Sequence, residues 1–449
     1  MTMTQSNLGV YYRSPKKRIV IRQVVLAVAV MATVLLPYIT IHERFYKPRF
    51  EDFVLLMIAV VSFFELPSKR MSPIIEYSYW NAKFTRIFLG MLYVAALSIG
   101  IGTNAFQQPL IFNDFMILFG MVRYWLILQV GQWTVRSTER RTFFWVLIAS
   151  LGLSALVGVL QYFNLLGVNY WLTPHYALGS QAHGGLDLVK RGIGMGRVVG
   201  THGDPRHYGY ILVVGMALCL ASLAHLRHRG FRVLVIIVLV LCLMSAVFTA
   251  SRTVVLSGIA VMITSVILSH RGQNRTKITL GLLIVFVVVG VWIIPRIDST
   301  AFERRVLDVE SVSFERSFNA RIRDLVRPFD YALDRPIIWL IGRGPSKAVI
   351  RTNSHNDFGW YFYRFGLPGL ILYLLLIANV AKIGFDAYQV TSFPLERSIS
   401  TAVTLLSINW FIYAMAENIF KQPQLMALNM WLVGAAIGIT RAEQQNESA

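Results

Sequence analysis

Long apolar runs recur along the whole chain, and they constrain its fold more than any other feature. A run of roughly 17–25 mostly apolar residues is long enough to cross a bilayer as a helix. Of the 449 residues, 55% are hydrophobic and 15% are charged, whereas soluble domains are nearer to a quarter charged. The runs are continuous rather than alternating, which excludes a transmembrane β-barrel. The sequence therefore predicts an all-α, polytopic protein that forms a single integral-membrane domain over residues 1–449.

Twelve membrane-spanning helices fit these runs. The first run follows the basic stretch YRSPKKRIVIR and has no small-residue cleavage site, so it is predicted to remain as an anchor. The predicted spans are 24–41, 53–66, 86–103, 113–133, 142–166, 208–226, 232–249, 254–269, 278–294, 363–384, 399–416 and 424–440.

The positive charge is distributed as membrane orientation requires. The net charge is +20, and much of the Lys and Arg lies in the short loops PSKRM, RSTERR, LRHRGFR and SHRGQNRTK. These loops all fall on one side of the predicted spans, together with both termini. Because short cytoplasmic loops carry an excess of Lys and Arg, we expect both termini to be cytoplasmic. No motif for binding nucleic acid is present, so the expected contact is the lipid bilayer and not nucleic acid.

Two loops on the opposite, external side are long. They cover about 167–207 and 295–360, and loops of this length are usually functional. The second loop lies between the ninth and tenth predicted spans, and it carries apolar residues at helical spacing. These residues are Phe318, Ile322, Leu325, Phe329 and Leu333. They predict a short amphipathic helix that caps the bundle.

The first polar cluster lies in RGIGMGRVVGTHGDPRHYGY, 191–210, where the chain enters a span. Its charged and histidine side chains include Arg197, His202, Asp204, Arg206 and His207. One interpretation is a turn with residues anchored at the membrane interface. The alternative is a flexible backbone that brings guanidinium groups onto an anion, because Arg presents a planar fork that matches phosphate oxygens.

A second cluster, FTASRTVV at 248–255, is a tight turn between two spans with Arg252 as its only charge. Arg252 either reaches the lipid headgroups, as long cationic side chains do, or meets a phosphate at the membrane surface. One further ion, Arg123, lies near the middle of the span 113–133. A charge at that depth is costly, so it should face the bundle interior or a wet cavity.

The third cluster, RTNSHND at 351–357, stands where the chain enters another apolar run. His355 could cap the following helix together with Asn356. Alternatively, its unperturbed pKa of about 6.5 suits it to accept a proton near neutral pH. Arg343, Arg351 and Arg364 lie nearby in the sequence. The loop does not offer the further ligands that a zinc site requires, so no metal is expected.

Together, GRVVGTHGDPRHYG, ASRTVVLSG and RGPSK…TNSHNDFGWYFYRFGLPGLILYL resemble the superfamily of O-antigen ligases and Wzy-type polysaccharide polymerases. The resemblance covers roughly 190–380, and members often have an aromatic residue and Asn where this chain reads THGDPRH. It implies a GT-C-like membrane glycosyltransferase of the bacterial inner membrane, with a periplasmic active site. Its donor would be a glycan on undecaprenyl diphosphate, with no metal and no other cofactor.

The resemblance also implies roles for single residues. It places Arg197 and Arg252 on the diphosphate and His355 as the general base of a catalytic set. Candidate substrate-binding residues are Arg123, Arg206, Arg343, Arg351 and Asn356.

Two reactions fit this family. A polymerase extends one lipid-linked glycan with another, whereas a ligase transfers the glycan to lipid A-core. GRGPSK before SHNDFGWYFYRFGLPGL favours a polymerase, for which a chain-length regulator is a further expected partner. A lipid-oligosaccharide flippase is the remote alternative. Transporters tend to have related halves and broken helices near the midplane, whereas the polar clusters here fall on one face.

Overall fold

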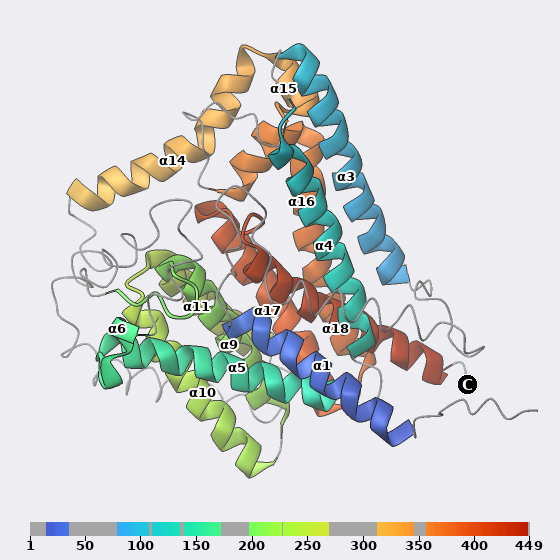
Figure 1. Cartoon of the computed structure of the whole chain (residues 1–449), viewed down its shortest axis with the longest axis vertical. Helices are drawn as coiled ribbons and strands as arrows, with labels where there is room; N and C mark the ends of the chain where they lie inside the picture. Colours follow the sequence, from blue (N-terminus) through green and yellow to red (C-terminus); the bar gives the residue numbers. More distant parts are fainter. Residues whose placement is uncertain are drawn as a thin grey trace, which may run out of the picture.

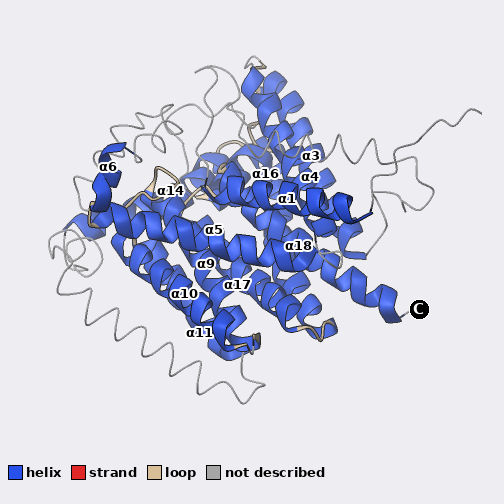
Figure 2. Cartoon of the chain, turned by 60° about the horizontal axis from the view of Figure 1, so that its bottom comes forward, coloured by secondary structure: helices blue, strands red, loops and turns tan. Residues whose placement is uncertain are grey.

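The computed structural model describes residues 15–35, 79–106, 110–134, 139–171, 197–226, 228–268, 312–344 and 356–447. Regular structure in these ranges is helical, and Figure 2 shows no strand among them. Eight of the described helices are long and apolar enough to cross a membrane. The chain is therefore an all-α, multi-pass membrane protein.

The described helices follow the predicted spans closely. Two predicted spans, 53–66 and 278–294, lie outside the described residues, so the count of twelve stays a prediction. The other ten each overlap a helix. The helices are α1 (Pro15–Leu35), α3 (Tyr79–Ala105), α4 (Phe112–Thr134), α5 (Glu139–Tyr162), α6 (Val168–Trp171), α9 (Pro205–His225), α10 (Arg229–Phe248), α11 (Arg252–Leu268), α14 (Val312–Leu333), α15 (Pro336–Ile341), α16 (Asp357–Val390), α17 (Pro394–Ala416) and α18 (Pro423–Glu447).

Local sequence explains where several helices begin. Helices α9, α15, α17 and α18 all start with proline. Its fixed φ suits the first helical position, where an N–H would have no intrahelical partner. Asp204 caps α9 by accepting a hydrogen bond from the backbone N–H of Arg206 at 2.7 Å. The Asp-Pro pair therefore starts α9 three residues before the predicted span.

The centre of the bundle is formed by α9 and α18. Both are apolar and buried along most of their length, as expected for helices that are hydrophobic on all sides. Glycines allow a close contact between α4 and α18. A Cβ atom on Gly434 would lie 2.4 Å from the carbonyl oxygen of Leu128. Small residues at such an interface let helix backbones approach within a membrane.

Contacts between helix ends sort into two groups, as alternating spans require. At one end, Thr201 before α9 donates to the carbonyl of Val34 in α1 at 3.3 Å, and Arg206 pairs with Glu417 after α17 at 2.7 Å. At the other end, His225 of α9 meets Thr401 of α17 at 3.1 Å. We call the first end, where α9, α11, α16 and α18 begin, the site end. The predicted external loops adjoin it, and the side of the membrane that it faces stays a prediction.

Helix α16 is a helical hairpin, whereas the sequence predicted a single span over 363–384. Gly366 has φ 68° and ψ −170°, and Pro368 follows. In a straight helix, Asp357 and Tyr373 would lie about 24 Å apart along the axis. Instead, the Tyr373 hydroxyl donates to Asp357 Oδ2 at 2.5 Å. The arm 357–365 therefore folds back along the arm 367–390.

Backbone donors satisfy the carbonyl groups that are freed at this break. Arg343 N donates to the carbonyl of Tyr363, and Gly344 N donates to that of Arg364, both at 2.9 Å. The Ser98 hydroxyl of α3 donates to the same Arg364 oxygen at 2.5 Å. Such substitution is what permits a broken helix inside a membrane protein. The break is thus part of the packing between α3, α15 and α16.

Helix α14 covers the stretch where the sequence predicts an amphipathic helix. Its C-terminal part packs on the bundle, because Phe329 stacks on Phe362 with ring centroids 4.2 Å apart. Ile322 and Leu333 of the predicted apolar stripe are exposed, at 44% and 70%. Figure 1 shows α14 extending from the α15 end away from the other helices. The helix therefore caps the bundle only through its last turns.

Candidate functional site

The segment before α9 is fixed by the turn between α10 and α11. Arg197 Nε donates to the carbonyl of Thr249 at 2.9 Å, and Val198 N donates to that of Phe248 at 3.1 Å. Arg252 follows three residues after Thr249 as the first residue of α11. The first two polar clusters of the sequence therefore meet at the site end, although 52 positions separate Arg197 from Thr249.

Glycine geometry explains the sequence GTHGDP between Arg197 and α9. Gly200 and Gly203 have φ values of 55° and 70°, in the left-handed region that favours glycine. A Cβ atom on Gly200 would also lie only 2.2 Å from the Tyr208 ring. Gly200 N donates to Gln161 Oε1 of α5 at 2.8 Å. The turn is therefore held against α5 and leads the chain directly into α9.

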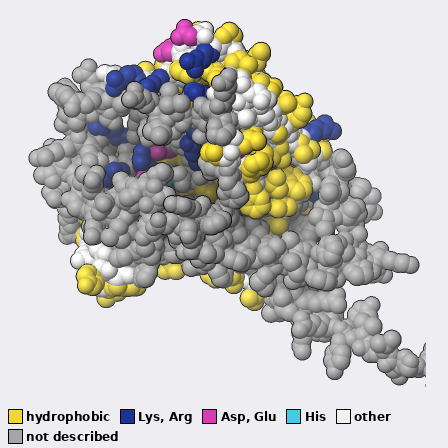
Figure 3. Space-filling model, turned by 45° about the horizontal axis from the view of Figure 1, so that its top comes forward, with side chains coloured by type: hydrophobic (Ala, Val, Ile, Leu, Met, Phe, Trp, Pro, Cys, Tyr) yellow, Lys and Arg dark blue, Asp and Glu magenta, His cyan; other side chains and the backbone are white. Residues whose placement is uncertain are grey.

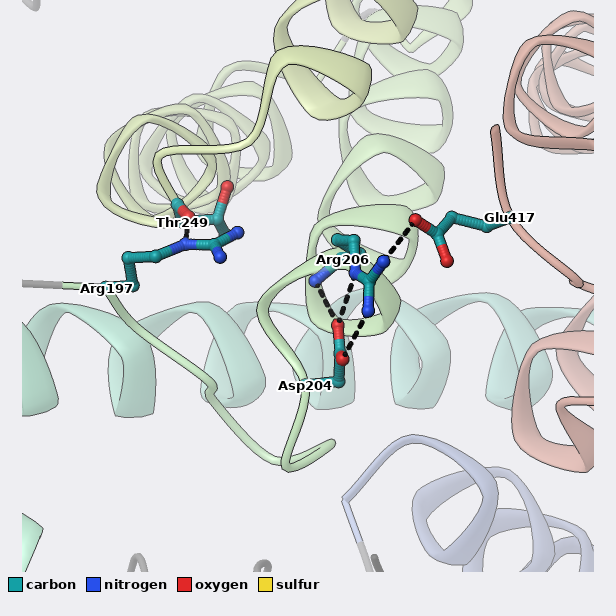
Figure 4. Close-up of polar contacts among 5 residues, drawn as sticks. All are labelled: Arg197, Asp204, Arg206, Thr249 and Glu417. Atoms are coloured by element: carbon teal, nitrogen blue, oxygen red, sulfur yellow. Dashed lines mark hydrogen bonds and ion pairs between the residues drawn. The ribbon is translucent and has the colours of Figure 1, made fainter. Parts of the chain in front are cut away.

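Arg206 lies between two carboxylates (Figure 4). Its Nη1 is 2.7 Å from Glu417 Oε1, and its Nη2 is 3.2 Å from Asp204 Oδ2. The pKa of Asp204 lies below its usual range. Burial alone would raise it, but the positive charges of His207 and Arg206 and the hydrogen bonds from Arg206 outweigh burial. Asp204 is therefore an ionised, permanent partner of Arg206.

We refer to Arg197, Arg206 and Arg252 together as the arginine cluster, because all three belong to segments at the site end. Figure 4 shows Arg197 reaching toward Thr249, and Arg206 at the start of α9 between Asp204 and Glu417. Figure 3, which views the upper face, shows Lys and Arg side chains close to Asp and Glu side chains on this face. The arrangement can attract an anion, although the Arg206 guanidinium already pairs with Asp204 and Glu417.

In the HND sequence at 355–357, Asn356 and Asp357 both have structural roles. Asn356 caps α16, because its Oδ1 accepts from Gly359 N at 2.6 Å. Asp357 is fully buried and accepts from Ile419 N at 3.0 Å and from Phe420 N at 3.2 Å. It therefore clamps the α17–α18 loop, 417–422, to the start of α16. His355, the predicted general base, lies outside the described residues, as does Arg351.

The remaining candidate arginines lie elsewhere. Arg123 is 5% exposed, so it faces the interior as the cost of a charge at that depth predicts. Its neighbour Tyr124 donates to the carbonyl of Phe420 at 2.9 Å, which places this part of α4 beside the 417–422 loop. Arg343 donates to the hydroxyls of Tyr331 and Tyr363. Those contacts join α14, α15 and α16 and do not bring Arg343 to the arginine cluster.

Sequence reasoning missed Glu417 and Asp357. Glu417 stands in ENIFKQP, a short loop that attracts attention only for its lack of positive charge. The sequence did place a carboxylate, Glu417, directly after one span and an arginine, Arg206, directly before another, and this pattern could have indicated a pair. Asp357 belongs to the third polar cluster but received no role, because two of its three hydrogen-bond partners, Ile419 and Phe420, lie more than 60 positions away.

No model of a known protein family matches the chain, and no curated protein matches it in sequence. Among the described residues, no group of three or more His, Cys, Asp or Glu side chains could hold a metal ion.

Proposed function

We propose that the protein is a GT-C-like membrane glycosyltransferase that uses a glycan carried on undecaprenyl diphosphate. The observation that carries the proposal is the bond from Arg197 to the carbonyl of Thr249 at the site end, three residues before Arg252 in the chain. Two cations from separate segments suit a diphosphate, whose charge grows as it leaves. The Asn356 cap of α16, next to His355 in the chain, lies at the same end.

The proposed chemistry is one group transfer. The acceptor hydroxyl attacks the anomeric carbon of the donor glycan, and His355 takes the hydroxyl proton. The new C–O bond forms as the bond to the diphosphate oxygen breaks. The arginine cluster stabilises the departing diphosphate, so neither a nucleotide sugar nor a metal is part of the proposal.

The best-supported reaction within this class is polymerisation by a Wzy-type polymerase of the bacterial inner membrane. The active site would be periplasmic and both termini cytoplasmic. A ligase that uses lipid A-core is the alternative, and the motif around GRGPSK favours the polymerase. Deleting the gene separates the two: single-repeat surface glycan on a gel indicates a lost polymerase, and accumulated long lipid-linked chains indicate a lost ligase.

The break in α16 favours a second candidate, because transporters often contain discontinuous helices. A lipid-oligosaccharide flippase therefore stays the remote alternative. A transfer assay with purified protein distinguishes the two functions. Lipid-linked donor and acceptor are supplied together in nanodiscs that contain the protein. A glycosyltransferase then produces a longer glycan, whereas a flippase does not.

The same assay tests the arginine cluster. Arg197→Ala and Arg252→Ala should each reduce transfer sharply in protein that stays folded. Arg→Lys should also be poor, because lysine keeps the charge but not the planar fork. Arg397→Ala is a matched control, since Arg397 Nε also donates to a backbone carbonyl, that of Thr391 at 2.8 Å, but at the opposite end. Equal activity in the Arg197 and Arg397 variants would contradict the proposal.

A further inference from the structure

Two cations flank a single tryptophan beside the 417–422 loop. The Arg364 guanidinium carbon lies 5.6 Å from the centre of the Trp360 ring, and Lys421 Nζ lies 5.0 Å from it. Arg364 and Trp360 are one turn apart on the short arm of α16, whereas Lys421 belongs to the loop. The tertiary fold therefore holds two like charges close to each other.

Neither cation is neutralised. Within the described part of the chain, neither Arg364 nor Lys421 has an ion pair or a side-chain hydrogen bond, although Arg364 is only 7% exposed. Trp360 is 2% exposed, and its indole N–H is buried without a hydrogen-bond partner. Buried donors and charges are costly when they lack partners. A buried indole N–H without an acceptor, beside two cations, indicates a site that can take an anionic acceptor.

Nearby charges do not compensate for this pair. Lys421 is exposed at the surface. Its pKa is nevertheless lowered from 10.5 to about 7, first by desolvation and then by the positive charge of Arg364. Asp357 opposes this shift but already accepts hydrogen bonds from the loop backbone and Tyr373. Asp114 of α4 interacts with Arg364 electrostatically but forms no ion pair with it among the described residues. The local field is therefore positive and suits an anion.

The location relates this pair to the arginine cluster. Trp360 N donates to the carbonyl of the cap residue Asn356 at 3.1 Å. Glu417, which holds Arg206, precedes Lys421 by four residues, a separation of at most about 14 Å along an extended chain. Arg206 and Lys421 thus lie at opposite ends of one short loop.

We propose that Arg364, Lys421 and the indole N–H of Trp360 form a second anion site for the phosphate group of the acceptor lipid. The inference rests on the proposed function, since a polymerase handles two lipid diphosphates at once. The arginine cluster holds the diphosphate that leaves. The second site holds the diphosphate that stays attached to the growing product, and it positions the acceptor without taking part in bond breaking.

Binding of undecaprenyl diphosphate without sugar tests this site. The protein is placed in nanodiscs of uncharged net composition, and the number of bound lipids is measured by native mass spectrometry. Wild-type protein should bind two. Lys421→Gln and Arg364→Gln should each weaken one site about 10- to 100-fold, and Arg197→Gln with Arg252→Gln should weaken the other. If neither the Lys421 nor the Arg364 variant changes the stoichiometry or affinity, the second site is wrong.

Controls separate charge from architecture. Lys382 Nζ also lies over a tryptophan, 5.4 Å from the Trp80 ring, but it is paired with Asp386 at 3.2 Å. Lys382→Gln should therefore bind two lipids like the wild type. Trp360→Phe keeps the ring and removes the N–H, so it should weaken the second site while the protein stays folded.

Two further results keep the two proposals apart. Loss of one lipid in Lys421→Gln, with no effect of the Arg197 and Arg252 changes, would retain the second site and overturn the proposed role of the arginine cluster. A parallel titration uses lipid A in place of undecaprenyl diphosphate. Binding of lipid A alone at the Lys421-dependent site would overturn the assignment to a diphosphate acceptor.

Discussion

Replacing Asp357 tests the link between α16 and the α17–α18 loop. Asp357→Ala leaves three donors without their acceptor: the Tyr373 hydroxyl and the backbone N–H groups of Ile419 and Phe420. A buried donor that loses its partner costs about 1–3 kcal/mol. Hydrogen bonds in membrane proteins lie toward the low end of that range. We therefore expect a loss of about 3 kcal/mol in the free energy of unfolding, a large share of the 5–15 kcal/mol typical of proteins.

Unfolding in mixed micelles measures this loss, and Asp357→Asn provides a milder variant of the same volume. Its amide group keeps one acceptor oxygen but turns a donor toward other donors, so its stability should lie between those of the wild type and the alanine variant. Asp386→Asn is the matched control on the same helix. It breaks only the exposed pair with Lys382, which is worth about 0–1 kcal/mol. Equal stability of Asp357→Asn and Asp386→Asn would refute the clamp.

Four other changes have defined outcomes. His355→Ala should lower transfer by roughly 10²–10⁴-fold while donor binding survives. Wild-type activity should fall at low pH, because an imidazolium cannot accept a proton. Normal turnover of the variant across pH would leave His355 without a catalytic role. Gly366→Ala should destabilise the protein by about 1–3 kcal/mol in thermal unfolding, because its backbone conformation is nearly restricted to glycine, whereas Gly100→Ala has open space and should be neutral. Glu417→Gln removes a negative charge beside the arginine cluster, so binding of undecaprenyl diphosphate should tighten several-fold in titration. Lys421 has a pKa of about 7 and loses its charge above it, so binding at the second site should weaken from pH 6 to pH 8, and Lys421→Gln should abolish that dependence.

Hydropathy predicted the helices well because a span is a local property. Twenty apolar residues must form a helix in a membrane to satisfy their own backbone groups, so each run can be recognised without its neighbours. The same reasoning places Arg123 in the interior, where it is found. Counting the spans from the N-terminus also assigns the residues at span ends to one side of the membrane. The meeting of Arg197 with the turn before Arg252 is consistent with that count.

Partnerships across the bundle could not be predicted in this way. Arg206 and Glu417 are 211 positions apart, and each alone resembles an ordinary charge at a membrane interface. A pair of opposite charges at two span ends gains meaning only when those spans are neighbours. Helix adjacency depends on side-chain packing, including the contact of α4 with α18 at Gly434, which periodicity does not reveal. Lys421 and Trp360 were missed for the same reason.

The hairpin in α16 shows how a correct local signal can be given the wrong geometry. Gly366 and Pro368 mark a break, but they do not determine whether the chain bends or reverses. The reversal is stabilised by Ser98, Arg343 and Gly344, whose donors satisfy the freed carbonyl groups. Those residues come from α3 and from the segment after α15, so the deciding contacts are remote in sequence.

The reversal changes the depth at which the proposed chemistry takes place. If α16 simply entered the membrane at residue 357, Asn356 would lie at the outermost point of the helix. Because the short arm runs back from Gly366, Asn356 instead lies about 14 Å from the hairpin tip, one arm length at 1.5 Å per residue, level with Tyr373. The α17–α18 loop, with Glu417 and Lys421, is clamped at that same level. A reaction placed there would lie deeper than the hairpin tip, and any exclusion of water at that depth would strengthen contacts between cations and a diphosphate.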